Sequence, residues 1–229
     1  QRPLAMLSFA LNHYFTGVDA RPMKLTNLAI HALNALLVFW LVRTLLRSPR
    51  LSGLASAGRQ QAIAWFAAAA WALHPINLMA VLFVVQRMES LCHLFVFLGL
   101  VLYLRGRQRQ LRGEPGWAQI TLGLVGCTGI GLLVKESAVL LPLYAFLLEC
   151  CVLRFDSARP GEARQLRWLY GVCLVLPAIA GLAWLLPAVT GPHSFSNRNF
   201  DLHERLLTES RVVMQYLSWT FYPDLNKLG

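Results

Sequence analysis

The chain has 229 residues, of which 56% are apolar and 14% charged, and its mean hydropathy is +0.50. Soluble domains carry about 25% charged residues, so these proportions argue against an ordinary soluble enzyme. Lys and Arg outnumber Asp and Glu by 21 to 11, a formal net charge of +10. On an apolar chain this excess is typical of the cytoplasmic loops of membrane proteins. It does not indicate nucleic acid, because the basic residues are scattered between apolar runs instead of forming one stripe.

Six apolar stretches predict an all-α, polytopic transmembrane helix bundle with about six crossings. A helix needs about 20 apolar residues to cross a bilayer, and the second and third stretches are shorter than this. The crossings are expected at residues 25–46, 62–73, 91–104, 117–134, 137–153 and 168–189.

Three further segments are expected to lie on the membrane surface. Residues 1–24 contain an amphipathic stretch and form the first of them. A short piece at 78–85 is the second. The third is 190–229, a polar loop followed by an amphipathic helix over 201–222. In that helix Asp201 is the N-cap and Glu204 stands three residues on, which is the spacing of a capping box.

Basic residues predict the orientation of the bundle. The connections 43–59, 105–116 and 154–167 each contain four arginines, and they alternate with the other connections. The positive-inside rule places them in the cytoplasm. The segments 74–90, 135–136 and 190–229 then share the opposite face.

His74, Arg87 and Glu89 are candidate functional residues, because ionisable groups near the hydrocarbon boundary are costly and tend to serve a role. Arg87 and Glu89 are two residues apart and do not share a helix face, so they could line two walls of one cleft. Alternatively, Arg87 extends to lipid phosphates and Glu89 marks a helix end.

Lys135 and Glu136 stand between two apolar runs, with no loop residues to spare. A tight turn here would hold the Lys135 ammonium at the membrane surface, where it could bind a phosphate or pyrophosphate head group. The alternative is a helix break with a surface Lys–Glu pair. Just before this turn, Gly123, Cys127 and Gly131 are spaced by four residues, which predicts a helix-packing face of small residues.

Asn27, His31 and Asn34 form one stripe of the first crossing. Polar groups in lipid need partners, so this stripe should point into the bundle and form interhelical hydrogen bonds. The five cysteines are odd in number and lack metal-ligand spacing, which favours small buried hydrophobic residues over disulfides or a zinc site.

An ordered series of motifs carries a family resemblance. The motifs are Arg2-Pro3-Leu4, Leu25-Thr26-Asn27 with His31 and Asn34, His74-Pro75-Ile76-Asn77, Val84-Val85-Gln86-Arg87-Met88 and Lys135-Glu136-Ser137-Ala138. Together they resemble the membrane part of GT-C-type glycosyltransferases. The resemblance is strongest to bacterial relatives of the transmembrane-and-tetratricopeptide O-mannosyltransferases, and it covers residues 2–153.

The resemblance implies an enzyme that moves a sugar from a polyprenyl-phosphate carrier to a protein or glycan acceptor on the non-cytoplasmic face. Because the relatives are bacterial, it further implies a multi-pass protein of the bacterial inner membrane, with its active face periplasmic. In such families an acidic residue in the first outer loop acts as catalytic base or metal ligand. That loop would precede Arg2, and tetratricopeptide repeats would follow the chain. We therefore expect an internal fragment that is inactive alone.

Site roles follow from combining the resemblance with the residues. Arg87 and Lys135 would hold the donor phosphate, because cations stabilise the charge that grows on a leaving phosphate, and Arg2 and Glu136 complete the substrate-binding set. Glu89 and His74 would position the acceptor or a divalent cation such as Mg²⁺ or Mn²⁺.

Two other classes of protein are weighed against this hypothesis. In a transporter or channel, Asn27, His31 and Glu149 would line a path, although one polar stripe and no internal repeat count against it. A non-catalytic membrane anchor for a repeat-containing scaffold is the second class. In the transferase hypothesis, Glu149 is expected to face Arg154 or the cytoplasmic interface.

Overall fold

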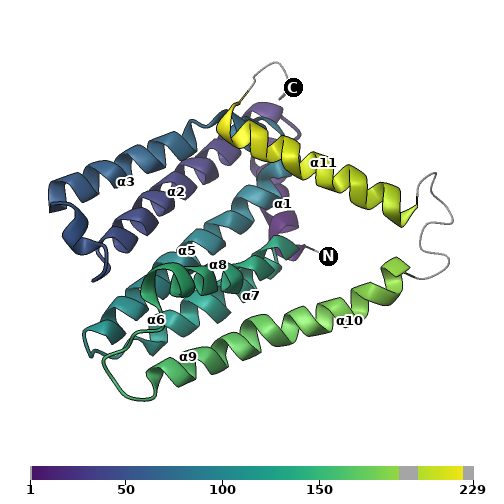
Figure 1. Ribbon diagram of the computed structural model, residues 1–229. Coiled ribbons are helices and arrows are strands. Elements are labelled where there is room, and N and C mark those ends of the chain that lie inside the picture. Colours follow the sequence, from purple (N-terminus) through teal and green to yellow (C-terminus); the bar gives the residue numbers. More distant parts are fainter. Residues whose placement is uncertain (1, 191–200, 224–229) are drawn as a thin grey trace. The chain divides into compact units, whose positions relative to one another are not determined.

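The computed structural model describes residues 2–190 and 201–223, and within these ranges the chain is helical and contains no strand (Figure 1). The chain divides into two compact units, Gln1–Cys173 and Leu174–Gly229. The all-α fold class predicted from the apolar runs is therefore confirmed.

The first unit is built from nine α-helices and several short 3-10 and π segments. Its elements are α1 (Pro3–Thr16), α2 (Ala20–Leu46), η1 (Ser52–Leu54), α3 (Ala57–Ala72), η2 (Pro75–Asn77), α4 (Leu78–Leu82), η3 (Val84–Gln86), α5 (Arg87–Leu111), α6 (Trp117–Thr121), η4 (Leu122–Gly126), α7 (Cys127–Leu132), η5 (Glu136–Leu140), α8 (Leu141–Leu148), η6 (Glu149–Leu153) and α9 (Glu162–Tyr170).

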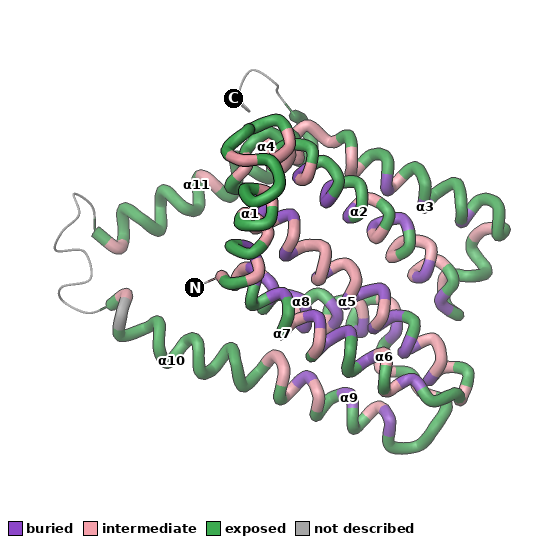
Figure 2. The backbone as a smooth tube through the Cα atoms, turned by 180° about the vertical axis from the view of Figure 1, so that it is seen from behind, coloured by how far each residue is buried: buried purple, intermediate pink, exposed green. Residues whose placement is uncertain are grey.

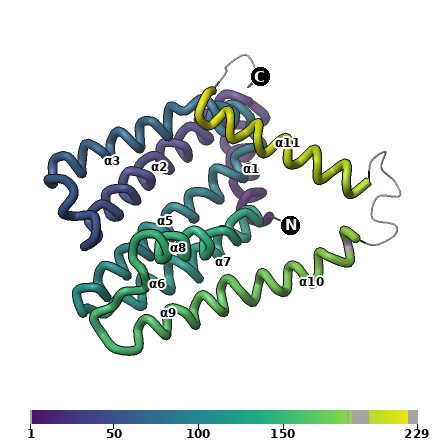
Figure 3. Tube along the Cα trace, in the orientation of Figure 1, coloured from purple at the N-terminus to yellow at the C-terminus, as the bar shows by residue number. Residues whose placement is uncertain are grey.

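Helix α5 is the central element of this unit. It packs against α2 along one side and against α6, η4, α7 and α8 along others, while α3 lies beside α2 (Figures 1 and 3). Its buried residues run from Arg87 at the first turn to Gln110 near the last (Figure 2). Side chains at both ends of α5 are therefore positioned by the same packed core.

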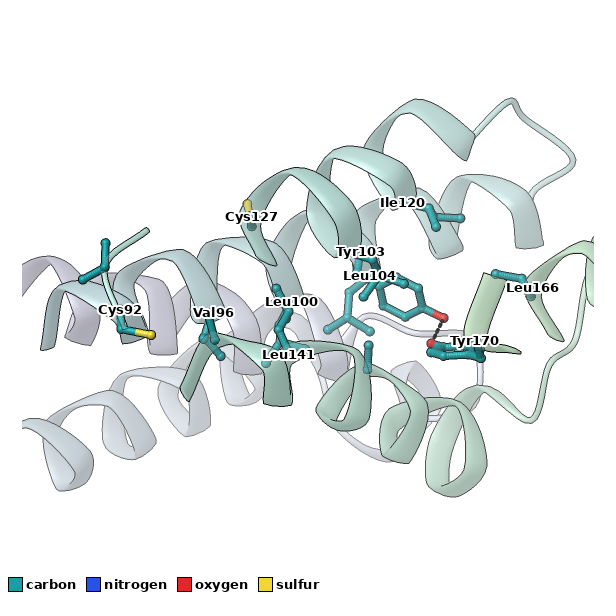
Figure 4. Packing of buried hydrophobic residues seen from close by; sticks show 14 of the residues in the cluster. Cys92, Val96, Leu100, Tyr103, Leu104, Ile120, Cys127, Leu141, Leu166 and Tyr170 are labelled. Atoms are coloured by element: carbon teal, nitrogen blue, oxygen red, sulfur yellow. Dashed lines mark hydrogen bonds between the residues drawn. The ribbon is translucent and has the colours of Figure 1, made fainter. Parts of the chain in front are cut away.

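The core around α5 consists mainly of Leu and Ala side chains, together with Val, Tyr and two cysteines (Figure 4). Gly99 of α5 meets Gly123 across the interface with the 117–132 helical segment: a Cβ added at Gly123 would lie 2.6 Å from the Gly99 carbonyl oxygen. The predicted small-residue face is confirmed, since Gly123 and Cys127 both pack on α5 and Gly131 packs against Ala138.

Within the described residues, four helices are long and apolar enough to cross a membrane: Ala20–Leu46, Val84–Leu111, Glu136–Leu153 and Glu162–Pro187. A fifth span results if Ala57–Ala72 and Pro75–Leu82 count together, although they are bent by 52°. By length and composition, four or five of the about six expected crossings are therefore long enough to span a membrane. The segment Trp117–Leu132 is helical as predicted, but it is shorter than the other spans.

Local sequence signals explain where the first helices begin and end. Asp19 accepts a hydrogen bond from the Arg21 backbone N–H at 2.9 Å and caps α2. Helix α2 therefore begins at Ala20, five residues before the predicted crossing. Pro75 disfavours helical geometry at the preceding residue, and His74 is extended, with φ −65° and ψ 128°, so α3 ends just before it.

The cysteine prediction is only partly correct. All five cysteines are free, and Cys92 and Cys127 are buried as predicted. Cys150 and Cys151 are exposed, and Cys173 is intermediate. An apolar membrane helix has sides that face away from the protein core, and hydrophobic runs alone do not distinguish those sides.

The second unit contains α10 (Leu176–Thr190) and α11 (Leu202–Phe221), and η7 (Gly171–Val175) joins α9 to α10. The predicted capping box of α11 is present: the Glu204 backbone N–H donates to Asp201 Oδ1 at 2.7 Å, and the Asp201 N–H donates to Glu204 Oε2 at 3.1 Å. Most of the predicted polar loop, 191–200, lies outside the described residues.

Candidate functional site

The predicted polar stripe on α2 brings the end of α3 and the start of α5 together at one end of the bundle. His31 Nε2 is 2.9 Å from the Ala72 carbonyl oxygen, and Asn34 Nδ2 donates to the Ser90 carbonyl at 2.8 Å. The two residues are one turn apart, so the end of α3 and the first turn of α5 meet at the same level of α2. His74 and Glu89 therefore lie at one end of the bundle, as predicted.

Glu89 and Lys135 form the centre of the candidate site. The Lys135 ammonium forms an ion pair with the Glu89 carboxylate, and Ser137 Oγ donates to the same carboxylate at 2.9 Å. The side chains of Lys135 and Glu89 are 27% and 31% exposed. His93 is also near, with its Nδ1 4.0 Å from Glu89 Oε1. A solvent-accessible cation thus stands beside a carboxylate that has several partners.

Arg2 and Glu136 form a second ion pair next to the first. The guanidinium donates from Nε to Glu136 Oε2 at 3.1 Å and from its terminal nitrogen to Oε1 at 2.5 Å. The start of α1 is held in place by the Leu4 backbone N–H, which donates to the Leu133 carbonyl at 3.1 Å. We call Arg2, Glu89, Lys135, Glu136 and Ser137 the Lys135 cluster.

The turn that presents this cluster has a local cause. The Lys135 N–H bonds to the Gly131 carbonyl at 2.8 Å, after which Lys135 adopts an extended conformation and η5 begins at Glu136. Gly131 allows the close return, because a Cβ there would lie 2.6 Å from Ala138 Cβ. The Cys92 thiol bonds to the Lys135 carbonyl at 3.6 Å, which ties the turn to α5. The predicted tight turn is confirmed.

Arg87 stands beside this cluster in sequence but points into the protein. Its side chain is fully buried and donates to Asn27 Oδ1 at 2.8 Å, to the Ser8 carbonyl at 3.1 Å and to the Met23 carbonyl at 2.9 Å. These bonds tie α1 and α2 to the first turn of α5. The structure thus gives Arg87 a structural role, and its predicted contact with a donor phosphate stays a prediction.

His74 closes the end of α3. Its Nδ1 accepts a hydrogen bond from the Ile76 N–H at 3.2 Å and caps the short η2. Among the residues that the structure describes, no group of three or more His, Cys, Asp or Glu gathers in a way that could hold a metal ion. Glu89 and His74 do not form a complete metal site by themselves.

A second polar cluster lies at the other end of α5. Arg107 Nε bonds to Glu149 Oε1 at 2.6 Å, Tyr103 donates to the same oxygen at 2.5 Å, and Phe155 N–H donates to Oε2 at 3.0 Å. Arg107 also bonds Gln110, and Tyr170 donates to Tyr103 at 2.7 Å (Figure 4). We call Tyr103, Arg107, Gln110, Glu149 and Tyr170 the Arg107 cluster.

This second cluster corrects one of the two predictions for Glu149, the contact of its side chain with Arg154. The carboxylate is paired with Arg107 and wholly buried, whereas only the backbone N–H of Arg154 contacts Glu149, at its carbonyl oxygen. The sequence did carry a signal for the pair, because Arg107 and Glu149 are opposite charges close to apolar runs and such charges need partners. Ser137 and His93 were also missed as partners of Glu89.

Comparisons with known proteins agree with the predicted resemblance. No family model and no solved structure matches the chain. Protein O-mannosyl-transferase Tmtc2 of Drosophila melanogaster is 32% identical over 200 residues, which cover 84% of this chain and 19% of that relative. The chain is homologous to the Tmtc proteins.

Protein O-mannosyl-transferase Tmtc1 of the same organism is 33% identical over 141 residues. That match covers 60% of this chain and 14% of the Tmtc1 relative. This Tmtc homologue therefore spans about a fifth or less of the length of the curated relatives it matches. Its apolar helices are those of a multi-pass membrane protein.

Proposed function

We propose that this chain is the membrane-embedded part of a GT-C-type glycosyltransferase that transfers a sugar from a polyprenyl-phosphate donor to a protein or glycan acceptor. The observation that carries the proposal is the partly exposed Lys135–Glu89 pair, with Arg2–Glu136 beside it at the same end of the bundle. Homology to two proteins named O-mannosyl-transferases supports sugar transfer as the reaction.

Lys135 and Arg2 are the groups suited to the donor phosphate. Negative charge grows on the phosphate as the sugar leaves, and cations placed there stabilise the transition state. The Arg2 fork now binds both oxygens of a carboxylate, a geometry that also matches two phosphate oxygens. Lys135 supplies a compact charge on the adjacent turn.

Glu136 occupies the place that the phosphate takes in this proposal. The cluster holds two cations and two carboxylates, so an incoming phosphate meets no net positive charge unless one pair opens. The Glu136 side chain is 71% exposed, and an ion pair so open to solvent contributes little stability. The Arg2–Glu136 pair is therefore the one that opens, while Lys135 stays between Glu89 and the donor.

Glu89 and His74 position the acceptor, and Arg87 positions Glu89. Glu89 stands on the first turn of α5, which Arg87 ties to α1 and α2. Arg87 is thus a positioning residue in this proposal.

The proposed reaction takes place on the non-cytoplasmic side, which for a bacterial inner membrane is the periplasmic face. The arginine-rich connections 43–59, 105–116 and 154–167 support this, because the elements that carry them meet at the Arg107 end of α5. The Gln108 side-chain amide donates to the Thr44 carbonyl, and Arg50 forms an ion pair with Asp156, so residues of all three connections are in contact there. The positive-inside rule assigns that end to the cytoplasm.

The described contacts offer no specific support for a transport path. Asn27 donates to the Phe83 carbonyl and His31 bonds the Ala72 carbonyl, whereas Glu149 is paired with Arg107 at the opposite end of α5. Each of these three polar groups is bonded to a different neighbouring segment, and together they do not line one route.

The test is mannose transfer from radiolabelled polyprenyl-phosphate mannose, measured in membranes that contain the full-length protein with Lys135→Met. Removal of one charge-stabilising donor typically lowers kcat by about 10²–10³-fold, and we expect a loss of that size. The matched control is Lys24→Met, an exposed lysine near the start of α2. Transfer by Lys135→Met at the wild-type rate would contradict the proposal.

A further inference from the structure

A cavity of about 260 Å³ lies between α2 and α5 at the Arg107 end, away from the Lys135 cluster. It is lined by Trp40, Arg43, Thr44, Arg47, Arg105 and Gln108, and we call it the arginine cavity. We propose that the arginine cavity binds a phosphate group, presented by the head group of a membrane lipid. This site is separate from the proposed reaction and does not depend on it.

Helical spacing places the lining residues on facing sides of the two helices. Arg43 and Thr44 stand three and four residues after Trp40 on α2, and the C-cap Arg47 stands three residues after Thr44, so the four residues share one face. Arg105 and Gln108 are three residues apart on α5. Gln108 Nε2 donates to the Thr44 carbonyl at 2.6 Å and closes the cavity between the helices.

The cavity contains three guanidinium groups and no carboxylate among its lining residues. Neighbouring arginines are already paired: Arg50 with Asp156, and Arg109 and Arg112 with Glu114. In the part of the chain that the structure describes, none of the ion pairs involves a cavity arginine. Their charge is therefore available to an anion from outside the chain.

Two of these guanidinium groups lie over the faces of aromatic rings. Arg105 Cζ lies 5.5 Å from the centre of the Trp40 ring, and Arg43 Cζ lies 5.8 Å from that of Phe39. A guanidinium in contact with an aromatic face keeps its N–H donors free in its own plane. Arg43 Nε is buried and has no hydrogen-bond partner within the described residues, so a donor is left for an incoming oxygen.

Location and size favour a lipid head group. The α2 span ends at Leu46, so the cavity lies where two apolar helices leave the hydrocarbon core. Lipid phosphates and exposed Trp side chains gather at this depth, and Trp40 is 46% exposed. The volume is just below the roughly 300–1,000 Å³ of drug-sized ligand sites, which suits a phosphate with its glycerol.

The experiment is native mass spectrometry of the full chain in detergent, titrated with phosphatidylglycerol or with diacylglycerol of the same acyl chains. The wild-type chain should retain one phosphatidylglycerol about tenfold or more tightly than diacylglycerol. This comparison needs no variant. Equal retention of the two lipids would overturn the proposal.

Variants locate the site. Arg43→Gln with Arg105→Gln should remove the preference, and Arg43→Lys with Arg105→Lys should keep part of it, because lysine retains the charge but not the fork. Arg59→Gln with Arg164→Gln is the matched control, since both side chains are exposed and belong to other helices. The proposal would also be overturned if the control variant lost as much of the preference for phosphatidylglycerol as the cavity variant.

A competition arm identifies the source of the phosphate. Millimolar inorganic phosphate that leaves phosphatidylglycerol bound supports the lipid head group. Displacement of the lipid by inorganic phosphate, with the same dependence on Arg43 and Arg105, supports a phosphate site that takes a soluble ligand.

Discussion

The two ends of α5 carry similar charged pairs in different surroundings. At the C-terminal end, Arg107 and Glu149 are both 0% exposed, and each has several further hydrogen-bond partners. At the N-terminal end, Lys135 and Glu89 remain about a third exposed, and the neighbouring Glu136 is mostly in solvent. Burial and the number of partners separate a pair that holds the fold together from one that can exchange partners with a substrate.

The comparison also explains why the fully buried Arg87 resembles Arg107 more than Lys135. Its guanidinium donates to three protein oxygens and lies 4.8 Å from the centre of the Phe9 ring. An arginine with this many internal partners is costly to redirect, because each unpaired buried group would lose its hydrogen bond. The following predictions test the contrast, starting with the largest expected effect.

Arg107→Met should destabilise the protein most. It leaves the Glu149 carboxylate buried without its cation, and removal of one member of a buried pair costs about 3–5 kcal/mol. Thermal unfolding in detergent, followed by circular dichroism, measures the loss, and Arg59→Met on the exposed side of α3 is the control. The double variant Arg107→Met with Glu149→Leu should recover part of the loss, since neither charge is then left unpaired. An unchanged midpoint of thermal unfolding for Arg107→Met would show that the Arg107 cluster does not stabilise the fold.

Arg87→Gln should lower stability more than it affects donor binding. The substitution removes the hydrogen bonds that the Ser8 and Met23 carbonyls accept from the guanidinium, and each hydrogen bond to a charged group contributes about 1.5–3 kcal/mol. Thermal unfolding and the donor KM, measured on the folded fraction, separate the two roles. A large rise in KM with unchanged stability would instead place Arg87 in direct contact with the phosphate. Arg87→Lys should not rescue stability, because an ammonium cannot reach three acceptors in a fork geometry.

Glu136→Gln should make donor binding slightly tighter. The neutral amide competes less well for Arg2, so the donor KM should fall by about threefold. Glu114→Gln is the control, because Glu114 is an exposed carboxylate paired with arginines at the other end of α5. A KM that rises on Glu136→Gln would mean that Glu136 binds the substrate itself.

Much of the fold could be predicted from the sequence because it depends on local patterns. Apolar runs located the helical stretches, Asp201 and Glu204 predicted the α11 cap, and the Gly123–Gly131 spacing predicted a packing face. The start of α2 was placed five residues late, because Asp19 caps the helix before the apolar run begins. The crossing predicted at 117–134 is helical, but as the apolar segment Trp117–Leu132 it is shorter than the other spans.

The sequence predicted which residues form the candidate site, but it did not predict which of them form ion pairs with one another. The tight turn drew attention to Lys135 and Glu136, and the polar cluster drew attention to Glu89. Lys135 bonds Glu89, and Glu136 bonds Arg2. These pairings depend on how α1, α5 and α7 pack, because the partners are 46 and 134 residues apart in the sequence. The same limit hid the Arg107–Glu149 pair, because neither residue has its partner within one helical turn.

Direct binding of the donor tests the central claim, that the Lys135 cluster holds the donor phosphate. Polyprenyl-phosphate mannose and the phosphate-free polyprenol of equal length are titrated against the purified full-length protein and its Lys135→Met and Lys24→Met variants. We predict that the wild type and Lys24→Met bind the phosphate-linked donor, and that Lys135→Met binds it about tenfold or more weakly. Wild-type affinity in Lys135→Met, or equal binding of the polyprenol, would contradict this account.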